Sequence, residues 1–204
     1  MKKFYFALLI SFISISLSNA QNRFGVQVGA SLNTTVNSKL QGCNFHYDLG
    51  GYFGGIYEIN LKQSWKILPQ FIISYDSPGG NSEEDVRSYF TRFAISVPIE
   101  IGYCIALNNK SSLLLSAGPF ARYDVFGRDK LYAYHGNEEQ PRFALGWWHG
   151  SMSEKLDYGI QGGVTYEVGK VFYSVKMKYS LKNDRWLNAY GHSLIFTAGV
   201  GYYF

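Results

Sequence analysis

The chain ends in FTAGVGYYF, residues 196 to 204, and this stretch decides the fold class. Every second residue from Phe196 to Phe204 is apolar or aromatic, whereas Thr197, two glycines and Tyr203 lie between them. An alternation with a period of two predicts a β-strand with one apolar face. The last residues of a domain are usually poorly ordered unless they are tied down. We therefore expect this strand to be paired and buried to its last residue.

The other end of the chain predicts export. Residues 1–20, MKKFYFALLISFISISLSNA, begin with two lysines, continue through an uncharged stretch at 4–17 and end on small residues. This pattern is typical of a secretory signal peptide, with cleavage after Ala20. The apolar stretch is shorter than the roughly 20 residues that a membrane-spanning helix needs. We expect a signal peptide at 1–20 and one mature domain at 21–204.

Composition narrows the class of the mature domain. Removing Lys2 and Lys3 leaves 17 basic against 15 acidic residues, and this small positive net charge does not indicate a nucleic-acid partner. No apolar run after residue 20 approaches the length of a membrane helix. The 17 Tyr, 15 Phe and 22 Gly are high counts for 204 residues. An exported chain with this aromatic surplus fits a membrane protein that crosses with strands.

Eight segments alternate with a period of two and carry no charge on their apolar positions. They lie at 24–30, 53–59, 65–75, 93–103, 113–123, 158–168, 173–181 and 196–204. Only helices and closed barrels satisfy every backbone group within hydrocarbon. A barrel strand needs about 9–11 tilted residues, apolar toward the lipid and free to be polar inside. The pattern predicts an all-β fold, an eight-stranded antiparallel up-and-down transmembrane β-barrel.

Aromatic residues near the segment ends match the two interfacial girdles of such barrels; Trp65 with Tyr75 and Phe93 with Tyr103 are examples. Pro69 and Pro98 fall inside segments, where each removes a ladder donor, so we expect local bulges there.

The connections alternate between short and long. Short ones follow the second, fourth and sixth segments, and long ones lie at 33–48, 76–89, 124–155 and 182–191. Outer-membrane barrels have short periplasmic turns and long outer loops. We therefore expect the outer membrane of a diderm bacterium, with both termini in the periplasm and the last strand closing the ring. A secreted β-sandwich or lipocalin-like cup has the same alternation, but the girdles, the loop asymmetry and the terminal Phe204 favour lipid.

Several stretches also resemble a known family. They are TRFAISVPIEIGY at 91–103, SLLLSAGPFARYDV at 112–125, LDYGIQGGVTYEVG at 156–169, VKMKYSLKND at 175–184 and the terminal GVGYYF. These resemble strands of the Bacteroidetes-type outer-membrane β-barrel family, described as porin-like or PorT-like. The resemblance covers most of the chain beyond residue 90. It implies the fold and the location, and not an activity, and Glu100 departs from the basic or apolar residue that is usual there.

The inward positions collect charges, and these form our predicted lumen network: Glu58, Lys66, Arg92, Glu100, Arg122, Asp157, Glu167, Lys176 and Lys178. An eight-stranded ring is just wide enough for side chains to fill it. Buried charges must be paired. We expect a cross-linked polar plug with a structural role, and the alternative is a path for ions or solutes.

A catalytic alternative rests on Trp147-Trp148-His149-Gly150-Ser151. On a strand, His149 and Ser151 would share a face, and Glu154 or Asp157 could orient the imidazole as in a hydrolase triad. The motif loosely resembles lipid A deacylase barrels, which have Asn where this chain has Met152. A tripeptide is weak evidence, so we expect no catalytic site.

Metal and disulfide chemistry are not expected either. The four histidines, at 46, 135, 149 and 192, fall in or beside the outer connections without the close spacing of a metal site. Cys43 belongs to an outer connection and Cys104 to the periplasmic end of a strand. The height of the barrel separates them, so we expect two free thiols and no cofactor.

The expected function is therefore that of an integral outer-membrane barrel with a structural, binding or assembly role. A small porin-like channel and a lipid-modifying enzyme are the alternatives. The expected partners are outer-membrane lipid, the barrel-assembly machinery during insertion, and an extracellular ligand or other envelope proteins at the long connections. The connection at 124–155 is rich in aromatics, so it either folds over the barrel mouth or forms a contact surface. By family resemblance, the terminal strand is an insertion signal carried by Phe196, Val200, Tyr202 and Phe204.

Overall fold

The computed structural model describes residues 22–36, 48–61, 64–76, 82–83, 86–135, 138–147, 155–182, 184–186 and 189–204. The predicted signal peptide, Cys43, His46 and the His149–Ser151 motif lie outside these residues. No helix within the described ranges is long and apolar enough to cross a membrane.

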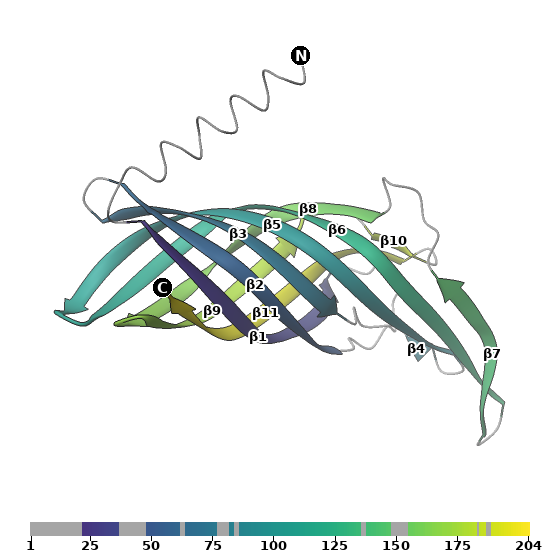
Figure 1. Ribbon diagram of the computed structural model, residues 1–204. Coiled ribbons are helices and arrows are strands. Elements are labelled where there is room, and N and C mark those ends of the chain that lie inside the picture. Colours follow the sequence, from purple (N-terminus) through teal and green to yellow (C-terminus); the bar gives the residue numbers. More distant parts are fainter. Residues whose placement is uncertain are drawn as a thin grey trace, which may run out of the picture.

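Eight strands form a closed antiparallel ring, as predicted. They are β1 (Arg23–Val36), β2 (Asp48–Asn60), β3 (Trp65–Asp76), β5 (Val86–Asn108), β6 (Ser111–His135), β8 (Leu156–Val168), β9 (Val171–Ser180) and β11 (Ala189–Tyr203). β1 pairs with β2 on one side and with β11 on the other, and the β5–β6 pairing completes the circle (Figure 1). The last strand therefore closes the ring against the first, which removes every sheet edge from the barrel wall.

Burial alternates along each strand and confirms the predicted faces. In β3 the inward residues from Lys66 to Asp76 are all buried, whereas Trp65, Phe71 and Tyr75 face outward and are about half exposed. On β9, Val175 is 64% exposed between the buried Ser174 and Lys176. An apolar exterior around a polar interior is the inverse of a water-soluble protein and suits a lipid solvent.

The two strand prolines do not form bulges, so that prediction is wrong. The pairing offset of β3 on β5 is the same on both sides of Pro69, and that of β5 on β6 is the same on both sides of Pro98. Losing one ladder donor does not insert a residue, so the register continues past each proline. In the pairing of β5 with β6, the register shifts lie away from Pro98, at Phe93/Ala94 and Ala106/Asn108.

The two ends of the barrel differ, and we call them the short-turn end and the extension end. At the short-turn end, β5 and β6 are joined by Asn109 and Lys110, and β8 and β9 by Gly169 and Lys170. Gly169 has a φ of 60°, a left-handed conformation that glycine adopts without strain. These short connections were predicted.

At the extension end, much of what we predicted as loop is strand. β5 starts at Val86 and β6 continues to His135, and β7 (Glu138–Trp147) pairs antiparallel with this last part of β6. β4 (Ser82–Glu83) pairs with β5, and β10 (Asp184–Trp186) pairs with β11. Figure 1 shows β6 and β7 continuing away from the ring instead of crossing its mouth. The backbone groups of these segments are satisfied by extending the existing ladders.

Candidate functional site in the barrel lumen

The inward side chains form successive layers along the lumen, and the first lies at the short-turn end. Arg23 donates to Glu58 at 2.7 Å and, across the lumen, to Glu167 at 2.8 Å. Lys66 lies 3.0 Å from Glu58 and 3.4 Å from Glu167. The Arg23 guanidinium also lies 4.1 Å from the centre of the Tyr203 ring. Two cations and two carboxylates thus join β1, β2, β3 and β8, with β11 in contact.

An apolar layer lies next to this first layer. Ile56, Leu68, Leu114, Phe172 and Tyr203 pack as one buried cluster, with Cys104 against it. The Phe172 and Tyr203 rings are 4.6 Å apart, and every member of the cluster except Cys104 is at most 4% exposed. Five of the eight strands contribute. The layer was not predicted, because its members are far apart in the sequence and only the closed ring brings their inward faces together.

The middle layer is built around Glu100, which is fully buried. The Lys176 ammonium donates to its two oxygens at 2.8 and 3.0 Å. Gln70 donates to Glu100 at 2.8 Å and is itself a partner of Gln27. Ser116 and Gln161 also donate to Glu100. The carboxylate is therefore saturated with donors from four other strands, as a buried charge must be.

A third layer lies toward the extension end. Arg122 lies 3.0 Å from Asp76 and 2.9 Å from Asp124, and Arg92 lies 3.3 Å from Asp124. Ser31 and Ser74 donate to Asp76 at 2.8 and 2.7 Å. All four charged side chains are at most 12% exposed. This layer links β1, β3, β5 and β6.

All nine residues of the predicted network lie on the inward face, and seven of them take part in these layers. The other two are Asp157, which accepts from Ser180, and Lys178, which is buried. Three charged members of the layers were not predicted: Arg23, Asp76 and Asp124. Each is next to the first or last outward-facing residue of a predicted strand: Arg23 precedes Phe24, Asp76 follows Tyr75 and Asp124 follows Tyr123. Strict alternation would therefore have assigned all three to the lumen.

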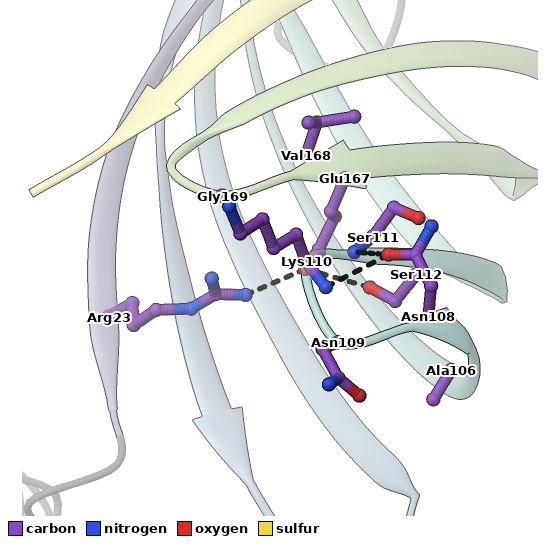
Figure 2. A pocket seen from close by; sticks show the side chains of 10 residues that line it. All are labelled: Arg23, Ala106, Asn108, Asn109, Lys110, Ser111, Ser112, Glu167, Val168 and Gly169. Carbon is purple, nitrogen blue, oxygen red and sulfur yellow. Dashed lines mark hydrogen bonds and ion pairs between the residues drawn. The ribbon is translucent and has the colours of Figure 1, made fainter.

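An open pocket of about 440 Å³ lies at the short-turn end. Figure 2 shows Arg23 reaching across it toward Glu167, with the β5–β6 turn on the other side. The turn is organised by Asn108, whose Oδ1 accepts from the backbone N–H groups of Lys110 and Ser111. Because Arg23 and Glu167 belong to the first ion-pair layer, the pocket is the outer surface of that layer.

The described cysteine and histidine residues, which were considered for thiol or metal chemistry, lie apart from one another. Cys104 is a half-buried free thiol, and His192 lies beside the Ser180 carbonyl at 3.0 Å. His135 ends β6, far along the strand extension. Within the described part of the chain, no three His, Cys, Asp or Glu side chains are grouped to hold a metal ion.

The C-terminal residues are paired to the end of the chain. Phe204 donates its backbone N–H to the Phe24 carbonyl at 2.9 Å, and the two rings stack with centroids 5.9 Å apart. Phe196, Val200 and Tyr202 face outward like Phe204, which is 68% exposed. The strand end is thus paired and its last side chain faces outward, as predicted, but that side chain is exposed and not buried.

The chain is similar to one protein family and to several solved structures. The sequence model of the outer membrane protein beta-barrel domain family matches residues 19–183. Among solved structures, Ail, the attachment invasion locus protein of Yersinia pestis, is similar with a TM-score of 0.48 and 15% identity over 90% of this chain and 99% of that one. Neisserial surface protein A has a TM-score of 0.45 and 15% identity, covering 89% and 97%. A major outer membrane protein from Thermus thermophilus has a TM-score of 0.49 and 8% identity, covering 90% and 100%.

No curated protein matches the sequence. The family match covers most of the chain, including seven of the eight barrel strands. The chain therefore belongs to the outer membrane protein beta-barrel domain family.

Proposed function

We propose that this outer-membrane barrel is closed to solutes and acts through its extension end as a structural or binding protein. The observation that carries the proposal is the order of the side-chain layers along the lumen. The apolar cluster of Ile56, Leu68, Leu114, Phe172 and Tyr203 adjoins the ion pairs on both sides, because Phe172 is the ladder partner of Glu167 and Leu68 is the ladder partner of Glu100.

Two physical arguments support a closed lumen. An eight-stranded barrel has an interior that side chains alone can fill. An apolar constriction also disfavours water, so ions would lose their hydration there without a replacement. The charges on either side are already engaged with one another, as in the Arg23–Glu58 and Lys176–Glu100 pairs. The same engagement supports a structural use of the carboxylates instead of a catalytic one.

The orientation and branch of the family are also proposals. The short turns lie at the same end as the start of β1 and the paired Phe204, so by the habit of bacterial barrels this end faces the periplasm. The basic, apolar and small-residue pattern at 1–20 supports removal of a signal peptide before insertion. The stretches at 91–103, 112–125 and 156–169 support the Bacteroidetes-type, porin-like or PorT-like branch.

The extension end is our candidate for contact with an extracellular ligand or another envelope protein. β5, β6 and β7 form a sheet that continues beyond the ring (Figure 1). β7 pairs with β6 at one edge of this sheet, and β4 pairs with β5 at the other edge. A segment that is already paired as strand loses less conformational entropy on binding than a free loop, which supports this end as a contact surface.

Conductance in planar bilayers tests the closed lumen. We expect no steady single-channel steps from the purified protein, because the apolar layer excludes hydrated ions. The double variant Leu68→Ala/Phe172→Ala removes two members of that layer and should begin to conduct. Phe71→Ala/Val175→Ala is the matched control, since it removes outward side chains from the same two strands and should stay silent. Steady steps from the unaltered protein would contradict the proposal.

Deletion of Phe204 tests the insertion signal. The deletion removes one outward ring, which stacks on Phe24, and one backbone bond, so it should cost a few kcal/mol at most. We expect assembly in cells to fall much more than the stability of refolded protein. The measurements are the amount of surface-inserted protein in vivo and the urea midpoint in detergent. Equal losses in both would reduce Phe204 to a packing residue.

A further inference from the structure

The pocket at the short-turn end is lined by two cationic side chains that have unused hydrogen-bond donors. Arg23 donates from Nε and Nη2 to Glu58 and Glu167, whereas its Nη1 atom makes no hydrogen bond to a described residue. The Arg23 side chain is 29% exposed and lines the pocket, so a ligand there can contact it. The Lys110 ammonium has no hydrogen bond or ion pair within the described part of the chain. Figure 2 shows Arg23 entering the pocket from β1 and Lys110 entering it from the β5–β6 turn.

The carboxylates of the first layer are already engaged, so they do not compensate Lys110. Glu58 accepts from Arg23 at 2.7 Å and from Lys66 at 3.0 Å. Glu167 accepts from Arg23 at 2.8 Å and lies 3.4 Å from Lys66. Within the layer, two cations thus balance two carboxylates. The pocket itself is lined by Arg23, Lys110 and one acidic residue, Glu167, and therefore carries a positive net charge.

The backbone around the pocket is fixed without a ligand. The Asn108 Oδ1 atom accepts from the backbone N–H groups of Lys110 and Ser111 at 2.9 and 2.8 Å. The β8–β9 turn is held against the β5–β6 turn, because the Gly169 N–H donates to the Lys110 carbonyl at 2.9 Å. A site whose walls are already in place loses less entropy when a ligand binds.

We propose that this pocket binds a phosphate group, which accepts from the Arg23 Nη1 atom and from the Lys110 ammonium. A phosphate has acceptor oxygens in several directions, so donors on different elements of the barrel can bind it together. The Asn109 side chain lines the same pocket and has an amide that can donate as well. The volume of about 440 Å³ holds a phosphate together with a small organic group. The ligand is therefore a phosphate ester, either a soluble one or the headgroup of a phospholipid.

The site lies at the outer surface of the first layer, so binding does not require an open lumen. Conductance is accordingly a separate readout: a conducting barrel would contradict the closed lumen without deciding this site.

Titration of the refolded protein with glycerol phosphate tests the site. The protein is kept in maltoside micelles, whose headgroups carry no phosphate, at constant ionic strength. The backbone amide signals of Gly169 and Ser111 are followed by NMR and should shift to saturation. Lys110→Met should weaken binding about tenfold, because it removes a charged donor.

Lys170→Met is the matched control. Lys170 is an exposed lysine on the adjacent β8–β9 turn, but it does not line the pocket, and its ammonium lies 5.8 Å from the centre of the Tyr202 ring. The variant should change the dissociation constant by less than about twofold, since salt screens its charge. Equal weakening by the two variants would overturn the proposal, because phosphate would then be attracted only by the general charge of this end. Shifts that do not saturate would overturn it as well.

A second comparison separates the two sources of the phosphate group. The titration is repeated in nanodiscs of phosphatidylglycerol. If lipid headgroups fill the pocket, the Gly169 and Ser111 signals should already be shifted there and should no longer respond to glycerol phosphate. If the ligand is soluble, glycerol phosphate should bind with the same affinity as in micelles.

Discussion

Replacement of Glu100 by leucine is expected to lower the free energy of unfolding by about 3–5 kcal/mol. Glu100 is fully buried and accepts both hydrogen bonds of Lys176, together with donors from three other side chains. Without the carboxylate, the Lys176 ammonium remains in the lumen as an uncompensated charge. Chemical denaturation of the refolded protein in detergent measures the loss.

The double variant Glu100→Leu/Lys176→Met is the control for the origin of this loss. It removes both charges and replaces them with apolar groups of similar volume, so most of the stability should return. The two side chains are in contact, and a double-mutant cycle should therefore show strong coupling. A double variant as unstable as the sum of the single ones would mean that the ion pair is not what Glu100 provides.

The second large effect is expected at a glycine. Gly201 lies on the inward face of β11, and a methyl group added there would fall on the Phe172 ring and 2.5 Å from the Val26 carbonyl oxygen. The ring cannot move freely, because it packs against Tyr203 in the apolar layer. We expect Gly201→Ala to cost about 2–3 kcal/mol through overpacking, measured by the same denaturation.

Two further variants separate overpacking from a general effect of alanine in the sheet. A methyl group on Gly55 would come no closer than 3.5 Å to another atom, so Gly55→Ala should be nearly neutral or stabilising. Adding Phe172→Leu to Gly201→Ala should restore part of the lost stability, because the ring clash is relieved while the carbonyl contact remains. If Gly55→Ala is as destabilising as Gly201→Ala, the close approach of β11 to Phe172 has no special role.

Several features of the barrel follow from local sequence. The alternation from Trp65 to Tyr75 fixes which side chains face outward, since consecutive residues of a strand point to opposite faces. The turn at Gly169-Lys170 follows from a glycine between two alternating segments. The eight strands and the closed ring could be predicted because a strand in lipid has no other way to satisfy its backbone.

The strand extensions could not be predicted in the same way. Residues 127–135 and 138–147 lack a clean apolar alternation, and they form strand by adding to ladders that the barrel has already started. The bulges expected at the prolines failed for a related reason, because the register of a strand is held by all of its neighbours and not by one residue.

The partners of the lumen side chains are the feature that local sequence determines least. In VKMKYS, the two lysines at 176 and 178 share a strand, a face and a sequence context, and the sequence alone determined only that both point inward. Tertiary structure decided that Lys176 meets Glu100, 76 residues away, while Lys178 meets no carboxylate among the described residues. It likewise brought Ile56, Leu68, Leu114, Phe172 and Tyr203 from five strands into one layer. The period of a strand sets the direction of a side chain, but the tilt and stagger of the closed ring set which inward residues share a height.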